Sequence, residues 1–454
     1  MIKPMMLSQI AELVGGVHRG DDVAIHSVST DSRNMPDQAL FVALRGEKFD
    51  GNQFVEGAKQ RGAVAALVSS PSTHLPCVEV VDTRKALGIV ARENRRAYSG
   101  PVIALTGSSG KTSTKELLAA ILSEEGPVLA TRGNLNNEIG LPLTLLNISH
   151  HHRYAVTEMG AAKSGDIAYL CGFAEPTIAI LTNAQAAHIA GFGSLDGVAN
   201  TKGEIFTALA AEGVAIINAD DVYADLWLKM AAHCRRRTFS LHSSSADVYA
   251  SDINRDQQGN QSFTLCSFAG NVAVTLPLPG EHMIRNALAA AAAALSAGAT
   301  LQSVAAGLGR AKNAEGRLSR HDIGGITLFD DSYNANPGSV AAAIKVLAEQ
   351  LGTRYLVLGT MAELGENAPQ HHRDIALMAR QSGIECLLCV GEFAELMAAE
   401  FGDGGRAFRD KIALQQDVLQ HIRSGDAVLV KGSRSAAMDT VVQALKTNLN
   451  GEPG

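Results

Sequence analysis

Short apolar runs alternate with amphipathic stretches along almost the whole chain, which predicts strands that alternate with helices. In the first hundred residues, the apolar runs 41–44 and 63–68 predict strands. The stretches 52–61 and 85–98 have the spacing of helices. Residues 1–100 are therefore expected to form a small α/β domain at the N-terminus.

A second series begins after Gly100 and Pro101, where the run 102–105 predicts a strand and 111–124 predicts a helix. Alternation of this kind is typical of a parallel sheet with helices on both faces. The further strands predicted from apolar runs are 154–156, 177–181 and 214–218.

Within 248–278 the pattern changes to short β segments separated by Gln-Gly-Asn and Ala-Gly-Asn turns, which predicts a small antiparallel extension. An alanine-rich helix at about 283–297 is expected near the end of this central domain, which we assign to residues 101–315.

The remaining residues, 316–454, repeat the alternation, with a helix that begins at Pro337 in the favoured first-turn position. This pattern predicts a C-terminal Rossmann-like domain. A chain of 454 residues is too long for one hydrophobic core, which agrees with three domains of the α/β class. The strands predicted in the last domain are 326–329, 355–358, 386–390 and 427–430.

The composition and charge of the chain argue against several classes of function. With 46% hydrophobic and 19% charged residues the chain has an ordinary globular balance. A net charge of −7 argues against a nucleic-acid partner, which usually binds a basic face. The longest apolar run, 287–297, is too short to span a membrane, and the N-terminus lacks a signal-peptide core. We therefore expect a cytoplasmic protein.

Two of the six cysteines, Cys386 and Cys389, form a C-x-x-C pair that could indicate redox or zinc chemistry. They lie inside the apolar run 384–390, and no second pair completes a zinc site. The sequence therefore favours two core cysteines in a buried strand.

The strongest local motif follows the strand 102–105 and precedes a helix. Its two glycines allow a tight turn, and the helix N-terminus offers N–H groups to a phosphate. The lysine can reach β- and γ-phosphates, and the threonine hydroxyl can ligate Mg²⁺. Because the full Walker spacing would need glycine at Leu105, we interpret the loop as a shorter P-loop. The motif is Gly107-Ser108-Ser109-Gly110-Lys111-Thr112.

A nucleotide–Mg²⁺ site also needs ligands near the phosphates, and in a parallel sheet these come from the ends of neighbouring strands. Glu158 follows the predicted strand 154–156, and His188 follows 177–181, so both are candidate metal ligands. The alternative for each is a solvated loop residue. From sequence alone, Lys202 resembles a surface helix lysine, and Asp330-Asp331-Ser332-Tyr333-Asn334 could be an exposed helix entry.

Taken together, these motifs resemble the Mur ligases, and within that family the type that adds D-alanyl-D-alanine. The resemblance covers essentially the whole chain. A short P-loop is shared by a superfamily, whereas three further segments point to this type. They are Asn134-Leu135-Asn136-Asn137, Asp331-Ser332-Tyr333-Asn334-Ala335-Asn336 and Lys431-Gly432-Ser433-Arg434-Ser435.

The resemblance implies a role for each domain. The N-terminal domain would hold the UDP end of a substrate, and the central domain would bind ATP with two Mg²⁺ ions. Lys202 matches a lysine that is carbamylated in many relatives, which would make it a metal ligand beside Thr112, Glu158 and His188. Catalytic roles are implied for Lys111, Glu158, His188, Lys202 and Arg317. The implied UDP-end residues are Ser32, Arg33, Arg45, Gly46 and Asp50.

Further roles follow from the same resemblance. Asn286 would contact the nucleotide, Arg317 would approach the γ-phosphate, and Asp331 would approach the ribose. Substrate contacts are implied for Asn134, Asn136 and Asn137. Contacts to ATP or the dipeptide are implied for Asn334, Asn336, Lys431, Ser433 and Arg434.

The implied activity is ATP-dependent ligation of D-alanyl-D-alanine to UDP-MurNAc-tripeptide through an acyl phosphate. This is a step in the cytoplasmic stage of peptidoglycan synthesis, and so of cell-wall biogenesis, cell shape and cell division. The resemblance also suggests a monomer. It leaves open whether the third stem residue is lysine or diaminopimelate.

Two positions depart from the family pattern. Met283 stands where asparagine is common, and Thr360 stands where aspartate is frequent. The alternative functions are another amide ligase of the superfamily, of the third-residue-adding or folylpolyglutamate type, and a P-loop ATPase without ligase activity. A nucleotide-binding structural protein without turnover is the third alternative.

Overall fold

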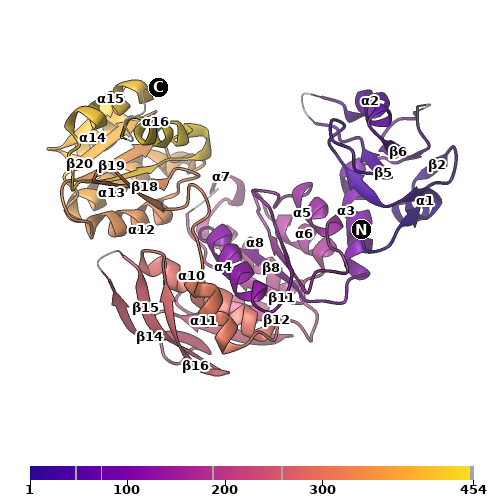
Figure 1. Ribbon diagram of the computed structural model, residues 1–454, viewed down its shortest axis with the longest axis horizontal. Helices are drawn as coiled ribbons and strands as arrows, with labels where there is room; N and C mark the ends of the chain where they lie inside the picture. Colours follow the sequence, from indigo (N-terminus) through magenta and orange to yellow (C-terminus); the bar gives the residue numbers. More distant parts are fainter. Residues whose placement is uncertain (47–48, 73, 187–188, 257–258, 450–454) are drawn as a thin grey trace.

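The computed structural model describes residues 1–46, 49–72, 74–186, 189–256 and 259–449. Within these residues, three large sheets of five, nine and six strands follow one another along the chain, each with its own helices (Figure 1). Residues 5–6 and 24–25 form a separate two-stranded sheet. We call these the N-terminal, central and C-terminal units. The central unit lies between the other two in Figure 1. The predicted architecture of three α/β parts is confirmed, and we propose that the units are domains with boundaries near residues 100 and 315.

The five-stranded sheet of the N-terminal unit has the order β2-β7-β6-β5-β4, parallel except for the β2–β7 pair. The helix predicted at 52–61 is a 3-10 turn η1 (Gly51–Phe54) followed by α2 (Val55–Gln60). The other elements are β1 (Met5–Met6), α1 (Leu7–Val14), β2 (Val17–Arg19), β3 (Ala24–Ile25), β4 (Ser27–Ser29), β5 (Ala39–Val42), β6 (Ala63–Val68), β7 (Cys77–Glu79) and α3 (Thr83–Arg96).

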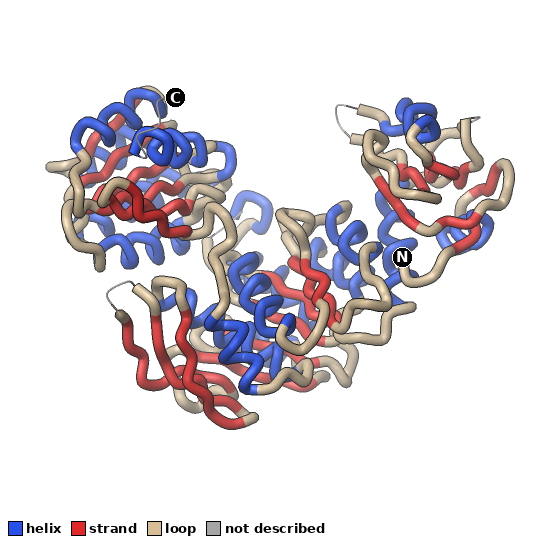
Figure 2. The backbone as a smooth tube through the Cα atoms, in the orientation of Figure 1, coloured by secondary structure: helices blue, strands red, loops and turns tan. Residues whose placement is uncertain are grey.

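The nine-stranded sheet of the central unit has the order β16-β15-β14-β13-β12-β11-β8-β10-β9. Its strands are parallel from β9 to β14, whereas β14, β15 and β16 pair antiparallel, which confirms the predicted extension (Figure 2). The strands are β8 (Val102–Thr106), β9 (Val128–Ala130), β10 (Tyr154–Glu158), β11 (Ile178–Leu181), β12 (Val214–Asn218), β13 (Arg235–Ser240), β14 (Val248–Arg255), β15 (Gln261–Ser267) and β16 (Gly270–Leu276).

Helices cover this sheet, and α4 carries the predicted P-loop at its start. They are α4 (Lys111–Ser123), α5 (Gly140–Leu146), α6 (Asp166–Ala174), α7 (Ile189–Phe192), α8 (Leu195–Thr207), α9 (Ala224–Met230), α10 (Glu281–Ser296) and α11 (Leu301–Gly309).

The C-terminal unit has the strand order β17-β18-β22-β19-β20-β21, parallel except for the β17–β18 hairpin. Asn336 caps α12 through its side chain, and Pro337 is the first helical residue, as predicted. The elements are β17 (Ser319–Ile323), β18 (Ile326–Asp331), α12 (Pro337–Ala348), β19 (Arg354–Gly359), η2 (Gly365–Asn367), α13 (Ala368–Gln381), β20 (Cys386–Val390), α14 (Ala394–Phe401), β21 (Gly405–Phe408), α15 (Lys411–His421), β22 (Ala427–Lys431), η3 (Arg434–Ala436) and α16 (Asp439–Leu449). Cys389 is fully buried in β20 and Cys386 is half-buried, and both are free thiols.

The N-terminal unit is joined to the central unit by a continuous apolar core. One cluster of buried side chains runs from Ile2 to Cys234 and includes residues of α3, α5 and α6. At Gly88 of α3 an added Cβ would lie 2.4 Å from the ring of Phe173, so the helices approach very closely. The buried Arg95 guanidinium also donates to Ala174 O over 2.8 Å. These contacts fix the two units against each other.

The C-terminal unit, in contrast, has apolar clusters made only of its own residues within the described chain. Hydrogen bonds connect it to the central unit, including Asn336 Nδ2 to Ser109 Oγ over 3.1 Å. An ion pair between Arg255 and Glu349 adds a second connection. The C-terminal unit is therefore attached through polar contacts at the edge of the central unit.

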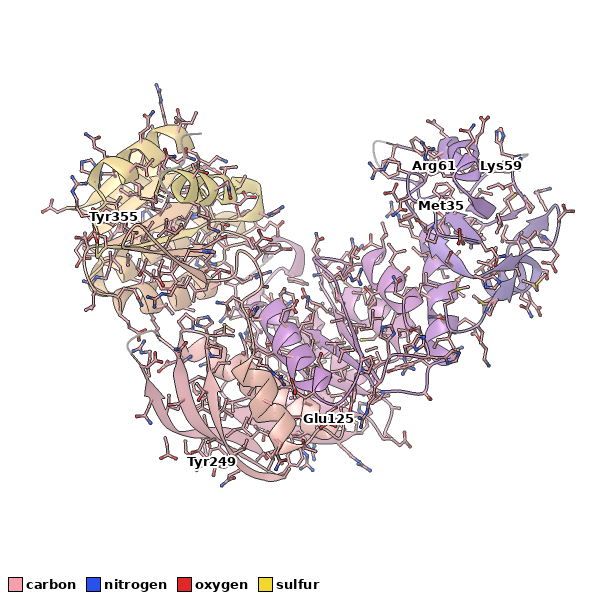
Figure 3. All side chains as sticks on the ribbon, viewed as in Figure 1. Met35, Lys59, Arg61, Glu125, Tyr249 and Tyr355 are labelled. Carbon is pink, nitrogen blue, oxygen red and sulfur yellow. The ribbon has the colours of Figure 1, made fainter. Side chains whose placement is uncertain are left out.

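Helix α4 packs against α10 and α11 (Figure 1). A Cβ at Gly307 of α11 would lie 2.4 Å from Ile121 Cα, so these two helices nearly touch. Glu125, labelled in Figure 3, accepts from Ser303 Oγ over 2.7 Å and joins the end of α4 to the start of α11. The position of the P-loop helix is thus determined by close packing.

Candidate active site

The turn between β8 and α4 requires glycine at two positions. Gly110 has a φ of +79°, and a Cβ there would lie 2.6 Å from Asn286 Oδ1. At Gly107 a Cβ would lie 1.8 Å from Thr182 Oγ1. The first-turn N–H groups of α4 have no partners inside the helix, and residues of this turn line a large cavity. The loop can therefore bind an anion, as a P-loop does.

The loop after β11 supports the tip of the P-loop. Ser109 N donates to Asn183 Oδ1 over 2.9 Å, and Ser109 Oγ donates to Gln185 Oε1 over 2.9 Å. We did not predict Asn183 or Gln185 from the sequence. Both lie between β11 and His188, in the segment where a metal ligand was predicted because it follows a strand of the parallel sheet. The polar side chains of that segment were the signal that could have identified them.

Thr112 and Glu158 meet at the carboxyl edge of the central sheet. Thr112 Oγ1 donates to Glu158 Oε2 over 3.0 Å, and Asn136 Nδ2 donates to Glu158 Oε1 over 2.9 Å. Glu158 is the last residue of β10 and is only 3% exposed. Arg317 Nη2 approaches Thr112 Oγ1 from the C-terminal side at 3.3 Å. The predicted convergence of the P-loop threonine and Glu158 therefore occurs in the structure.

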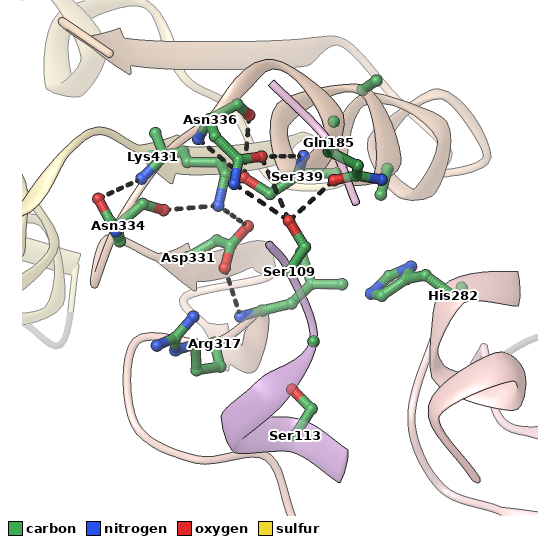
Figure 4. A pocket seen from close by; sticks show the side chains of 18 of the residues that line it. Ser109, Ser113, Gln185, His282, Arg317, Asp331, Asn334, Asn336, Ser339 and Lys431 are labelled. Atoms are coloured by element: carbon green, nitrogen blue, oxygen red, sulfur yellow. Dashed lines mark hydrogen bonds and ion pairs between the residues drawn. The ribbon is translucent and has the colours of Figure 1, made fainter. Parts of the chain in front are cut away.

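A cavity of about 1130 Å³ lies between the central and C-terminal units, next to the P-loop (Figure 4). Its walls include most of the residues predicted to contact ATP or the dipeptide. These are Ser108, Ser109, Gly110, Lys111, Thr112, Asn286, Arg317, Asp331, Asn334, Asn336, Lys431, Ser433 and Arg434.

Cationic side chains dominate the part of the cavity near the P-loop. Lys111 Nζ donates to Gly107 O over 2.8 Å, and burial lowers the pKa of Lys111. The guanidinium of Arg317 stacks on the ring of Tyr333 at 4.1 Å, and Arg434 lies over the same ring at 5.6 Å. Tyr333 was not predicted to have a role, although it lies in the Asp331–Asn336 segment.

Asp331 and Lys431 form a buried ion pair opposite the P-loop. Lys431 Nζ lies 2.6 Å from Asp331 Oδ2 and also donates to Asn334 O over 2.9 Å. Burial raises the pKa of Asp331 and lowers that of Lys431, while each charge opposes the shift of the other. The prediction of an exposed helix entry at 330–334 is wrong for Asp330 and Asp331, which are buried at the end of β18. Asp330 pairs with β17 and β22, and Asp331 pairs with β22.

The two departures from the family pattern have different surroundings. Met283 accepts a hydrogen bond at its sulfur from Asn286 Nδ2 over 3.7 Å, so it orients the side chain that lies beside Gly110. The neighbouring His282 lines the cavity, and burial lowers its pKa to about 4. Thr360 instead lies at a smaller cavity of about 360 Å³ with Lys411 and Ser433.

Lys202 is not on the surface. The prediction from sequence alone is wrong, because the side of α8 that carries Lys202 faces the core and leaves it 2% exposed. Its Nζ lies 5.7 Å from the centroid of the Phe192 ring. Burial, and then the Lys111 ammonium, lower the pKa of Lys202 well below its ordinary value. His188 lies outside the described residues. Within the described part of the chain, no group of three His, Cys, Asp or Glu residues is arranged to hold a metal.

The residues predicted to hold the UDP end lie on the N-terminal unit, and none of them is among the cavity residues of the described chain. Arg33 pairs with Asp31 over 2.9 Å in the same turn, beside Ser32. Asp50 accepts from Asn52 N over 3.0 Å and forms an isolated β-bridge with Arg45, the residue before Gly46. Arg45 accepts at its carbonyl from Arg84 over 2.6 Å.

The three asparagines of the loop 134–137 have different surroundings. Asn137 Oδ1 accepts from Gly140 N over 2.9 Å and so helps to begin α5, whereas Asn136 reaches Glu158. Asn134 is exposed at the tip of the loop. The structure therefore brings Asn136, of the three asparagines, to the candidate metal ligand.

Among the described residues, no helix is long and apolar enough to cross a membrane. Trp227, the single tryptophan, is fully buried and donates to Ala199 O over 3.1 Å, which makes it a packing residue.

Three family models match the chain. They describe the Mur ligase family catalytic domain at residues 24–95, the Mur ligase middle domain at 105–294 and the Mur ligase glutamate ligase domain at 316–434. Together they cover parts of all three units.

Curated relatives match over nearly their full length. The chain is 45% identical to the UDP-N-acetylmuramoyl-tripeptide--D-alanyl-D-alanine ligase of Escherichia coli, over 97% of this chain and 98% of that protein. It is 32% identical to the enzyme of the same name from Bacillus subtilis, with the same coverage.

Solved structures also match over nearly their full length. A MurF structure from Acinetobacter baumannii has a TM-score of 0.92 and 34% identity, and it covers 98% of this chain and 99% of its own. A MurF ligase from Thermotoga maritima in complex with ADP has a TM-score of 0.84 and 27% identity, with 94% and 98% coverage.

The buried Asp331–Lys431 pair predicts an asymmetric response to mutation. Lys431→Met should lower the free energy of unfolding by about 3 kcal/mol, because a buried carboxylate then lacks its partner. Calorimetry would follow the transition of the C-terminal unit. The double variant Lys431→Met/Asp331→Asn should recover most of the loss.

The matched control is Lys446→Met. Lys446 lies 3.9 Å from Asp330 and is 25% exposed, so its loss should cost less than about 1 kcal/mol. Equal losses from the two single variants would contradict the assignment of the buried pair.

Proposed function

This chain belongs to the Mur ligase family, and we propose that it joins D-alanyl-D-alanine to UDP-N-acetylmuramoyl-tripeptide in an ATP-dependent reaction of peptidoglycan synthesis. The observation that carries this proposal is the identity to ligases of that name over almost the whole chain, including the C-terminal unit. A shared P-loop alone would support only nucleotide binding.

The chemistry requires activation of the tripeptide. A carboxylate is a poor electrophile, so its oxygen first takes the γ-phosphoryl group of ATP, and ADP leaves. The free amine of D-alanyl-D-alanine then attacks the carbonyl carbon of the acyl phosphate. A tetrahedral intermediate collapses, the amide bond forms, and inorganic phosphate leaves while the amine loses a proton.

Phosphoryl transfer depends on charge neutralisation and alignment more than on covalent help from the protein. Lys111 at the start of α4 would move from Gly107 O to the β- and γ-phosphates, and Arg317 would face the γ-phosphate. Asp331 would accept from the ribose, and Asn286 would contact the nucleotide. Both side chains line the same cavity.

Thr112 and Glu158 fit a Mg²⁺ site. Two oxygen ligands at right angles around Mg²⁺ lie about 3 Å apart, given metal–oxygen distances of about 2.1 Å. Thr112 Oγ1 and Glu158 Oε2 are 3.0 Å apart, so a small shift would bring both into one coordination sphere. Mg²⁺ would neutralise phosphate charge there. We propose two ions, with His188 and Lys202 as further candidate ligands.

Lys202 would contribute as a carbamate. A lysine whose pKa is lowered by burial presents a neutral amine, which can add CO₂ and release a proton to give a carboxylate-like group. A carbamate would convert a buried neutral amine beside Lys111 into an anion suited to Mg²⁺.

The substrates would lie on both sides of the central unit. The N-terminal residues Ser32, Arg33, Arg45, Gly46 and Asp50 would hold the UDP end, and Asn134, Asn136 and Asn137 would contact the tripeptide. Lys431, Ser433 and Arg434 would contact ATP or the dipeptide, with Asn334 and Asn336 beside them.

Closure of the C-terminal unit would exclude water from the acyl phosphate. We further propose a cytoplasmic monomer, as the resemblance to the Mur ligases suggests.

The proposal is tested by phosphate release from ATP and Mg²⁺ with UDP-MurNAc-tripeptide, with and without D-alanyl-D-alanine. Release should require both substrates, and mass spectrometry should detect UDP-MurNAc-pentapeptide. Lys111→Met should lower kcat by about 10²–10³-fold, because a preorganised cation at the phosphates is lost. The exposed Lys163→Met is the matched control and should behave as the wild type.

Two outcomes would favour other functions. Phosphate release that ignores both substrates would indicate a P-loop ATPase. Stimulation by a different amine, such as glutamate or a diamino acid, would indicate another amide ligase of the superfamily.

Carbamylation of Lys202 predicts a specific label. After incubation with ¹³C-bicarbonate, the ¹³C NMR spectrum of the wild type should contain a carbamate carbon that is lost in Lys202→Met and kept in Lys163→Met. The signal should weaken as the pH falls, because protonation of the amine competes with CO₂. Identical spectra from wild type and Lys202→Met would refute the carbamate.

A further inference from the structure

Lys115 is a buried lysine that does not line the cavity. It lies one turn after Thr112 in α4 and is 1% exposed, although its neighbours Leu117 and Leu118 would suit an apolar core. Its Nζ donates to Thr131 O over 2.7 Å and lies 2.8 Å from Glu116 Oε1. A buried ammonium is costly unless it is bonded and paired, so these contacts determine where the side chain lies.

Thr131 connects Lys115 to the end of β10. It directly follows β9 and is 2% exposed. Its N–H donates to Val156 O over 3.0 Å, and its Oγ1 accepts from Glu158 N over 3.0 Å. The carbonyl of Thr131 thus binds α4 through Lys115, while its hydroxyl holds the backbone of Glu158.

These bonds close a ring around the candidate metal site. From α4, Thr112 Oγ1 bonds to the carboxylate of Glu158, Glu158 N bonds to Thr131, and Lys115 returns from Thr131 to α4. Thr131 also begins the loop that carries Asn136, whose amide holds the other oxygen of the same carboxylate. Both carboxylate oxygens of Glu158 therefore depend on the position of Thr131 relative to α4.

We propose that Lys115 is a positioning residue of the nucleotide–Mg²⁺ site, acting through Thr131 on Glu158. This inference rests on the proposed function, because it assumes that Thr112 and Glu158 ligate Mg²⁺. Without Lys115, Thr131 and the following loop can move away from α4, and the 3.0 Å approach of Thr112 and Glu158 is no longer enforced. Groups that orient a metal ligand typically change metal affinity by about 10–100-fold when they are removed.

The test measures binding rather than turnover. ADP affinity is determined by isothermal titration calorimetry over a range of Mg²⁺ concentrations, for the wild type, Lys115→Met and Thr131→Val. In both variants, the Mg²⁺ concentration that gives half of the gain in ADP affinity should rise by about 10-fold or more. ADP affinity without Mg²⁺ should be unchanged, since the P-loop is intact. Thr131→Val removes only the acceptor of Glu158 N and keeps the carbonyl that Lys115 binds.

Leu122→Ala is the control for a purely structural effect, because Leu122 is fully buried near the other end of α4. It should lower the thermal unfolding midpoint yet keep the wild-type Mg²⁺ response. If Lys115→Met does not fold, the Mg²⁺ response of Thr131→Val alone decides whether the proposal holds. Wild-type Mg²⁺ responses in the folded variants would overturn the positioning role and leave the site intact. A wild type whose ADP affinity ignores Mg²⁺ would instead overturn the site itself, and the inference with it.

Discussion

The sharp turn from β8 into α4 can form only with glycine at two positions, because a Cβ atom at either one would collide with a neighbouring residue. Packing contacts from much of the molecule hold that turn in place. Gly107 and Gly110 abut Thr182 and Asn286 so closely that any side chain would collide. The turn places the positive end of the α4 dipole at the carboxyl edge of a parallel sheet, where anions bind. Close packing of α10 and α11 against α4, and hydrogen bonds from the loop after β11 to the tip of the P-loop, hold that position.

The two outer units are attached in different physical ways, and the difference suits a ligase. The N-terminal unit shares a continuous apolar core with the central unit, which makes their relative position stiff. The C-terminal unit keeps its own core and is joined by hydrogen bonds such as that between Asn336 and Ser109. Polar contacts of this kind can be exchanged for contacts to a nucleotide at modest cost, which would allow the proposed closure of this unit over ATP.

Those parts of the fold that depend on local pattern could be predicted from the sequence. The largely buried strands β6, β12 and β20 match the predicted ranges, and α12 begins at Pro337 as expected. Short strands such as β1, β3 and β9 were missed, because two or three residues leave too little periodicity to detect. The P-loop was predicted since its residues are contiguous, and Glu158 because strand ends converge in a parallel sheet.

The burial of polar residues could not be predicted in the same way. Lys202, Asp331 and Lys115 are buried because of what packs on them from distant segments, and no local feature marks this. The Lys115–Thr131–Glu158 connection joins three elements that are separate in sequence. Tertiary contacts of this kind arrange the residues of a recognised motif into a site.

The most direct test of the central claim, ligation through an acyl phosphate formed at the P-loop, follows one oxygen atom. UDP-MurNAc-tripeptide labelled with ¹⁸O in the acceptor carboxylate is converted with ATP and D-alanyl-D-alanine, and the released inorganic phosphate is analysed by mass spectrometry. The account predicts one ¹⁸O atom in each phosphate, because the carboxylate oxygen leaves with the phosphoryl group. Unlabelled phosphate would contradict it, since ATP would then be hydrolysed by water without activation of the tripeptide.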